Sequence, residues 1–383
     1  MFRVLHRTWR LVGLSLASLL LGSQSHAGTA GTLYSYSVSV GDATATANAV
    51  IFDGLHIWVA VEDQSGGWIK KLTLTGAVLS STSVGIGPLQ MAYDGARIWV
   101  SDYASSDITI VAQDGAVAKT IALPPKAAPE GILFDGKYMW VANNGVGANT
   151  VSKYNPGTMT LISHYTVGDD PDGLAFDGTY LWVTNSNSNN VMKLDWETGT
   201  ILRTYPTGRF PLSIIFDGTY MWISNGLDAD VGGFRTGSVT KVRAYGGITL
   251  GTIPVGGAVR GLAYDGTSIW VCNSMDDTFT RLRVSDGLRL GTYRTGAAPR
   301  SMAFDGVRVW IANSGANTIT VVTPDSRPIV RRGGVRGSFT EIVPTPLAPM
   351  QTPVDSAFSG FVHKSPVTPA ALANIESTLL NDN

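Results

Sequence analysis

Apolar and polar residues alternate along most of this chain, in short runs separated by Gly, Asn, Asp and Thr. Alternation with a period of two predicts half-buried β-strands, and the Gly and Asn content argues against helices. The segment from Gly173 to Leu194 shows the pattern most clearly. Together with the residues that follow it, this segment predicts four strands, at Leu174–Phe176, Tyr180–Thr184, Val191–Leu194 and Ile201–Tyr205.

The same four-strand unit occurs seven times. Each copy has an Asp-Gly pair, whose Asp residues are Asp53, Asp94, Asp135, Asp177, Asp217, Asp265 and Asp305. A Trp stands five residues after each Asp, at Trp58, Trp99, Trp140, Trp182, Trp222, Trp270 and Trp310. Successive Asp residues are 40 to 42 positions apart, except for one step of 48. This period is typical of a propeller blade, in which Asp-Gly would form a two-residue hairpin turn.

Side-chain size also alternates in the first strand of each unit. Phe or Tyr precedes every Asp, whereas the residue before that aromatic is small in several units, such as Ala175 and Ala303. Alternate residues of a strand point to opposite faces. We therefore expect a seven-bladed β-propeller of four-stranded antiparallel blades, in which large and small faces nest and the seven Trp side chains form core.

The two ends of the repeat array suggest how the ring closes. Leu33–Val40 resembles the last strand of a repeat, for instance Leu161–Gly168, whereas the seventh unit loses its pattern after its third strand. The sequence thus predicts that the N-terminal strand completes the last blade and removes the open edges. Ile329-Val330 is the alternative source of this strand. The fifth unit carries about eight extra residues between Asn225 and Val239, which we expect to form a Gly-rich loop.

The predicted domains are a signal peptide at 1–27, the propeller at 28–325 and a Pro-rich tail at 326–383. A short helix is expected at 370–380. In the first segment, three Arg precede an apolar run, Leu11–Leu21, that is too short to span a bilayer, and Ala27 ends a cleavage motif. We expect a secreted or periplasmic protein with a bacterial Sec-type signal and no membrane span after cleavage.

The composition of the chain bears on its binding partners and on its cysteine chemistry. Only 15% of residues are charged and the formal net charge is -1, a balance that does not support nucleic-acid binding, which needs a concentrated basic surface. The single cysteine, Cys272, cannot form an internal disulfide, and its apolar neighbours indicate a buried filler. We expect a monomer.

Three units carry a family resemblance: GLAFDGTYLWVTNSNSNNVMKL, SMAFDGVRVWIANSGANTITVV and GLAYDGTSIWVCNSMDDTFTRL. They resemble the YVTN-type β-propeller repeats of secreted bacterial proteins and are similar to the streptogramin (virginiamycin B) lyase-like propellers. The likeness covers residues 33–323. The lyase resemblance implies catalytic histidines and a glutamate around a magnesium ion. No histidine of this chain matches such a position; the five are His6, His26, His56, His164 and His363.

The position five residues before each Asp should ring the mouth of the central channel. The seven residues there are Asn48, Leu89, Glu130, Asp172, Leu212, Arg260 and Arg300. We interpret Asn48, Glu130, Asp172, Arg260 and Arg300 as a candidate binding site. Its arginines could hold a carboxylate or phosphate, and its acids could accept from hydroxyls or amines. Alternatively, the four charged residues pair with one another across the mouth or are fully solvated.

The loops after the second strands are rich in Asn, Ser and Asp, and we expect Trp68 and Tyr103 to add aromatic surfaces there. Two functions follow. The first is a non-catalytic scaffold that binds a protein, peptide or glycan through the loop face and channel mouth. The second is a lyase or hydrolase with a divalent metal at Glu130 and Asp172. No cofactor is predicted, although a magnesium or calcium ion is compatible with the two acids; the metal, if any, is unknown.

Overall fold

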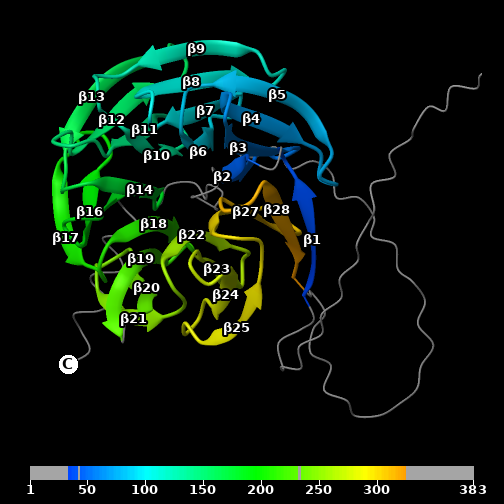
Figure 1. The fold of residues 1–383 in the computed structure, drawn as a ribbon. Helices are drawn as coiled ribbons and strands as arrows, with labels where there is room; N and C mark the ends of the chain where they lie inside the picture. Colours follow the sequence, from blue (N-terminus) through cyan, green and yellow to red (C-terminus); the bar gives the residue numbers. More distant parts are fainter. Residues whose placement is uncertain (1–32, 42–43, 232–233, 325–383) are drawn as a thin grey trace, which may run out of the picture.

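The computed structural model describes residues 33–41, 44–231 and 234–324. These residues form 28 strands and no helix, arranged in seven four-stranded antiparallel sheets. The sheets stand around a central axis as a ring (Figure 1). The predicted seven-bladed β-propeller is therefore confirmed. The predicted signal peptide and C-terminal tail lie outside the described residues.

Blades 1 to 6 each run from an innermost to an outermost strand in chain order. Blade 1 contains β2 (Thr46–Phe52), β3 (Ile57–Asp63), β4 (Gly66–Leu72) and β5 (Val78–Val84). Blade 2 contains β6 (Pro88–Tyr93), β7 (Arg97–Asp102), β8 (Asp107–Ala112) and β9 (Val117–Ala122). Blade 3 contains β10 (Pro129–Phe134), β11 (Met139–Asn143), β12 (Thr150–Asn155) and β13 (Thr160–Thr166). Blade 4 contains β14 (Pro171–Phe176), β15 (Tyr180–Asn185), β16 (Asn190–Asp195) and β17 (Ile201–Pro206).

Blade 5 contains β18 (Pro211–Phe216), β19 (Tyr220–Val231), β20 (Phe234–Arg243) and β21 (Thr249–Pro254). Blade 6 contains β22 (Val259–Tyr264), β23 (Ser268–Asn273), β24 (Thr278–Arg283) and β25 (Arg289–Arg294). Blade 7 takes three strands from the end of the array and one from the start: β26 (Pro299–Phe304), β27 (Val309–Asn313), β28 (Thr318–Thr323) and β1 (Tyr34–Ser39).

The ring is closed by the N-terminal strand. β1 pairs antiparallel with β28 over six residues, from Tyr34 opposite Thr323 to Ser39 opposite Thr318. Figure 1 shows this dark blue strand beside the orange one. Beyond the strand, the Val40 amide donates to the carbonyl of Asn317 at 2.8 Å. Of the two candidate segments, residues 33–40 therefore supply the last strand, as predicted; Ile329-Val330 lies outside the described residues.

The fixed spacing of Asp and Trp has a local cause. In every blade, one carboxylate oxygen of the Asp accepts from the indole N–H of the Trp five residues later, at 2.6–2.8 Å. The other oxygen accepts from the backbone amides two and three residues on, as in Asp217 with Thr219 and Tyr220. All seven Trp side chains are fully buried. Each Asp carboxylate thus accepts hydrogen bonds both from a buried indole N–H and from the backbone amides of the turn.

The predicted two-residue turn is wrong in detail. The strand partners flank four residues rather than two, as with Phe52 opposite Ile57. Of the Asp-Gly pair only the Gly has a positive φ, between 90° and 97° in the seven turns. The Asp keeps an ordinary φ. Its backbone N–H donates to the carbonyl three residues on, as Asp53 does to His56 at 3.1 Å, and its carboxylate accepts from the amides two and three residues on.

We expect Asp217→Ala to lower the free energy of unfolding by roughly 3 kcal/mol, because a buried indole N–H and two turn amides lose their acceptor. Urea unfolding followed by tryptophan fluorescence measures the change. Asp114→Ala is the matched control. Asp114 accepts from a single amide in an exposed turn, so its loss should change stability by less than about 0.5 kcal/mol. Equal losses in the two variants would contradict the structural role of the Asp–Trp pair.

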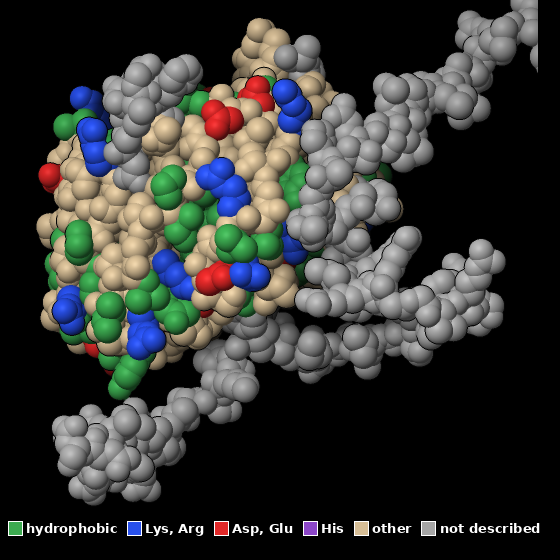
Figure 2. Space-filling view, turned by 90° about the horizontal axis from the view of Figure 1, so that it is seen from below, with side chains coloured by type: hydrophobic (Ala, Val, Ile, Leu, Met, Phe, Trp, Pro, Cys, Tyr) green, Lys and Arg blue, Asp and Glu red, His purple; other side chains and the backbone are tan. Residues whose placement is uncertain are grey.

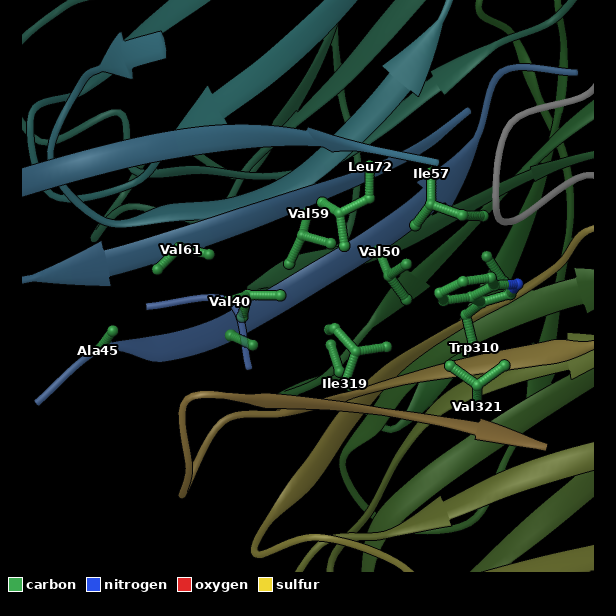
Figure 3. Packing of buried hydrophobic residues seen from close by; sticks show 13 residues of the cluster. Val40, Ala45, Val50, Ile57, Val59, Val61, Leu72, Trp310, Ile319 and Val321 are labelled. Atoms are coloured by element: carbon green, nitrogen blue, oxygen red, sulfur yellow. The ribbon is translucent and has the colours of Figure 1, made fainter. Parts of the chain in front are cut away.

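The hydrophobic core consists of seven clusters, one between each pair of neighbouring blades. The cluster at the closure joins blade 7 to blade 1 (Figure 3). There Val40 lies between Val59 of blade 1 and Ile319 of blade 7, and Trp310 packs at the end of the cluster. The predicted nesting of blades is thus confirmed. Cys272 is buried in the cluster between blades 6 and 7, and burial raises the pKa of its thiol.

The extra residues of the fifth unit are not the predicted loop. They lengthen β19 and β20 into a hairpin, with Ala229 opposite Thr236 and Val231 opposite Phe234. A register shift separates this extension from the regular part of the ladder, between Asn225 and Ala229. The sequence prediction failed here because Gly226 and the acidic residues after it match turn composition as well as they match an extended hairpin.

The outermost strands are exposed edges with mixed side chains. Ile201, Leu250 and Leu288 lie in or next to these strands and are about half exposed. β21 and β25 lie at the lower edge of the ring in Figure 1, and Figure 2 shows from below that basic side chains are interspersed with hydrophobic ones. Charged side chains along such edges oppose edge-to-edge pairing with other sheets. Within the described ranges, no helix is long and apolar enough to cross a membrane.

Candidate functional site

The residues predicted to ring the channel mouth lie at breaks in the β-ladders. In blade 3, Pro129 pairs with Asn143, but the next pair is Ile132 with Val141, so that Glu130 is left out of the ladder. The same shift leaves out Asp172 in blade 4 and Arg260 in blade 6. A bulge of this kind turns a side chain out of the alternating pattern. It explains why one strand position carries the variable side chains.

Four blades bring these side chains to one cavity. Glu130, Asp172, Arg260 and Arg300 line it, together with Gln90, Leu212 and nearby backbone. Its empty volume is about 480 Å³, including the part that opens to solvent. The inner strands approach closely here: a Cβ added at Gly173 would lie 2.3 Å from the carbonyl oxygen of Leu212. The neighbouring inner strands therefore leave no room for a side chain at Gly173.

Asp172 is the most buried of the four charged residues, with 5% of its surface exposed. The amide of Asn144 donates to its Oδ1 at 3.2 Å. Its Oδ2 accepts from no N–H or O–H donor among the described residues, although a protonated Asp172 can hydrogen-bond to Glu130. Burial raises the pKa of Asp172 well above its usual value, and the negative charge of the nearby Glu130 raises it further. Asp172 therefore holds its proton more strongly than a solvated aspartate does.

Arg300 lies across the channel from the acids. Its Nη2 is 3.8 Å from Oε1 of Glu130, and both side chains are about one-fifth exposed. Burial lowers the pKa of the Arg300 guanidinium, and the charge of Arg260 lowers it further. Glu130 and Arg300 thus form an ion pair between blades 3 and 7. The alternative prediction, that the charges pair across the mouth, is thus confirmed for Glu130 and Arg300.

Tyr103 lies on the acidic side of the mouth, in the turn after β7, and is 38% exposed. Burial raises its pKa, followed by the charges of Glu130, Asp170 and Asp172. Asp170 extends the acidic side. Burial and the charge of Asp169 raise its pKa, and the Asn187 amide donates to its carboxylate. Asp170 was not among the predicted site residues, although the acids at 169, 170 and 172 were a signal for it.

Two predicted site residues are placed differently. Trp68 was expected in a loop, but it lies in β4, where it packs against the core cluster at the closure and donates to Asp63 at 3.2 Å. The reason is that blade 1 has a tight turn, with Asp63 opposite Gly66, so that the strand begins earlier. Asn48 lies at the bulge of blade 1, but it is buried and does not line the cavity.

The two histidines that the structure describes do not line the cavity at the channel mouth. His56 lies in an Asp-Gly turn with its Nδ1 3.6 Å from Asp53, and His164 is in the outermost strand β13. Over the described ranges, no three or more His, Cys, Asp or Glu side chains are grouped so as to hold a metal ion. Glu130 and Asp172 would supply two ligands at most, and Glu130 already faces Arg300.

Comparison with known proteins identifies the fold. No protein-family model matches the chain, and no curated protein sequence matches it. A hydrazine synthase chain from Kuenenia stuttgartiensis superposes with a TM-score of 0.64 at 20% identity, covering 75% of this chain and 97% of that one. An inactive virginiamycin B lyase from Staphylococcus aureus, with quinupristin, superposes with a TM-score of 0.62 at 17% identity, covering 76% and 99%.

A streptogramin B lyase also superposes, with a TM-score of 0.62 at 16% identity, covering 76% of this chain and 97% of that one. The resemblance to virginiamycin B lyase-like propellers is thus confirmed for the fold. The name YVTN rests on the repeat sequences alone. At these identities the superpositions carry no residue roles from the lyases to this chain.

Proposed function

We propose that this chain is a non-catalytic binding propeller that holds a polar segment of a protein, peptide or glycan at its channel mouth. The observation that carries the proposal is the Oδ2 of buried Asp172, which accepts from no donor among the described residues, in a cavity lined by two acids and two arginines. A buried polar atom without a partner costs free energy, which a ligand that hydrogen-bonds to it would recover.

The ligand would meet different groups on the two sides. Arg260, which has no ion pair within 4 Å among the residues that the structure describes, would take a carboxylate or a carbonyl oxygen of the ligand. A protonated Asp172 would donate its O–H, and Tyr103 would offer a ring and a hydroxyl at the rim. The alternative lyase or hydrolase is less well supported, because Glu130 is engaged by Arg300 and the mouth is lined by no histidine.

We expect the double variant Arg260→Ala, Arg300→Ala to lose at least about tenfold in affinity for a mouth ligand, which corresponds to ~1.4 kcal/mol. The ligand would come from peptide and glycan arrays probed with the wild-type protein and from mass spectrometry of co-purified material. Arg294→Ala removes an exposed arginine from the outermost strand of blade 6 and serves as the control. Binding that survives in the double variant, with the control unchanged, would exclude the mouth as the site.

We also propose that the protein is exported, because residues 1–27 combine three arginines, an apolar run and a cleavage motif ending at Ala27. Intact-mass measurement of protein recovered from the periplasm or medium should give a chain that begins at Gly28. A chain that retains its first 27 residues would exclude cleavage at this point.

A further inference from the structure

On the Asp-Gly side of the ring, a lysine lies in the groove between neighbouring blades. In blade 4, Lys193 lies with its Nζ 3.9 Å from the ring centre of Tyr180 and 5.1 Å from that of Trp182. The same Nζ donates to the carbonyl oxygen of Ala244 in blade 5, at 2.9 Å. Lys153 in blade 3 repeats this arrangement, with Tyr138 at 4.1 Å. Each lysine thus lies over aromatic rings of its own blade and binds the next blade.

The groove between blades 3 and 4 is filled by Trp196. Its ring centre is 5.7 Å from that of Tyr138 and 5.9 Å from that of Phe176. Lys137 and Lys153 approach the same indole, with Nζ atoms at 5.2 Å and 5.5 Å from its centre. This groove therefore accepts a flat aromatic ring between two aromatic walls and under two cations.

The next groove has the same walls but no filling ring. Asp195 lies opposite Tyr180 in blade 4, and Arg243 lies opposite Tyr220 in blade 5, so Ala244 occupies the position of Trp196. The result is a pocket between blades 4 and 5, lined among others by Tyr180, Phe216, Lys193, Arg243 and Tyr245. Its empty volume is about 880 Å³, including space that opens to solvent.

The charges of this pocket are unbalanced. Lys193 faces Asp177, with Nζ 3.8 Å from its Oδ2, and that carboxylate also accepts from the indole of Trp182. Arg243 is exposed at the opening, and the described residues place no carboxylate within 4 Å of it. Tyr245 beside it is 79% exposed. An anion at the opening would therefore meet an arginine whose charge is not compensated.

We propose that the groove between blades 4 and 5 binds a small aromatic carboxylate. The aromatic ring takes the place that Trp196 fills one blade earlier, between Tyr180 and Phe216 and next to the ammonium group of Lys193. The carboxylate lies toward Arg243, where a guanidinium can bind it through two parallel hydrogen bonds. This site lies on the Asp-Gly side of the ring and is separate from the channel mouth.

Indole-3-acetate is the probe, measured by calorimetric titration of the wild-type protein beside indole and tryptamine. A ligand of this size should bind with a dissociation constant of roughly 0.1–10 mM. Indole-3-acetate should bind several-fold more tightly than indole, and tryptamine more weakly than either. Arg243→Ala should remove the advantage of the carboxylate. Equal affinities for the three compounds, or no binding by the wild type, would overturn the proposal.

The neighbouring groove provides matched variants. Ala244→Trp should fill the pocket in the way that Trp196 fills its own, abolish binding and leave the melting midpoint unchanged or higher. Trp196→Ala should open a second groove and raise the stoichiometry for indole from one to two. Binding by Ala244→Trp equal to that of the wild type, or an unchanged stoichiometry in folded Trp196→Ala, would overturn the site. The mouth variant Arg260→Ala, Arg300→Ala should bind the probe normally.

Discussion

A chain that lacks residues 33–41 is expected to lose more than about 10 °C in melting midpoint and to aggregate. Without β1, blade 7 keeps three strands and the edge of β28 is left unpaired over six residues. The cluster between blades 7 and 1 also loses Val40, which is 1% exposed, and the partly buried Val38. Differential scanning calorimetry and size-exclusion chromatography measure the two effects.

Point variants separate closure from simple truncation. Val38→Asp places a charge against the closure cluster and should reproduce most of the destabilisation. Ser37→Asp changes the adjacent side chain, which is exposed on the opposite face of the same strand, and should change the melting midpoint by no more than about 2 °C. If both variants melt like the wild type, β1 does not hold the ring closed.

The propeller could be predicted from the sequence because the same strand pattern and the same Asp–Trp hydrogen bond recur in all seven blades. The Asp and the Trp recur at a fixed spacing since each Asp carboxylate accepts from the buried indole five residues later. The N-terminal strand could be recognised because its alternation matches the outermost strands of the other blades. In these features, residue type and spacing alone determine the structure.

The site was predictable only in outline. Counting five residues back from each Asp found Glu130 and Arg300, but not that they lie 3.8 Å apart, since distance across a channel depends on the whole ring. The count also selected Asn48, which lies at a bulge like that of Arg300 but is buried and does not line the cavity. The pocket beside Ala244 was not predicted from the sequence. It exists because blade 5 has a small residue where blade 4 has Trp196, and this matters only once the structure shows that Trp196 fills the neighbouring groove.

Blade 2 carries an acid at a buried position where five other blades carry Asn. These Asn residues stand three positions after the Trp of the second strand, and their amides donate to side chains of the third strand: Asn143, Asn185, Asn225, Asn273 and Asn313. In blade 2 the residue is Asp102, which is fully buried. Thr109 donates to its Oδ2 at 2.6 Å, and its Oδ1 has no hydrogen-bond partner among the residues described.

Burial raises the pKa of Asp102 to about 8, and the nearby Asp107 adds to the rise. An unfolded chain releases this proton near pH 4, so between about pH 4 and pH 8 the folded state binds one proton more than the unfolded state. Its stability should therefore fall as the pH rises through this window, by up to ~1.4 kcal/mol per pH unit. The groups that face Asp102 are Asp107, Thr109 and the backbone of Gly85.

Asp102→Asn should remove this dependence, because an amide has no proton to lose and can donate as in the five blades that carry Asn. We expect the variant to match the wild type near pH 4 and to be more stable by roughly 3–5 kcal/mol near pH 8. Urea unfolding at a series of pH values measures the difference, with Asp114→Asn in an exposed turn as the control. Parallel stability curves for the wild type and Asp102→Asn would show that Asp102 is ionised in the folded protein at neutral pH. In that case the position would need a buried cation or a water molecule to hold its charge, since the described residues nearest to it offer only Thr109, the Gly85 amide and a second acid.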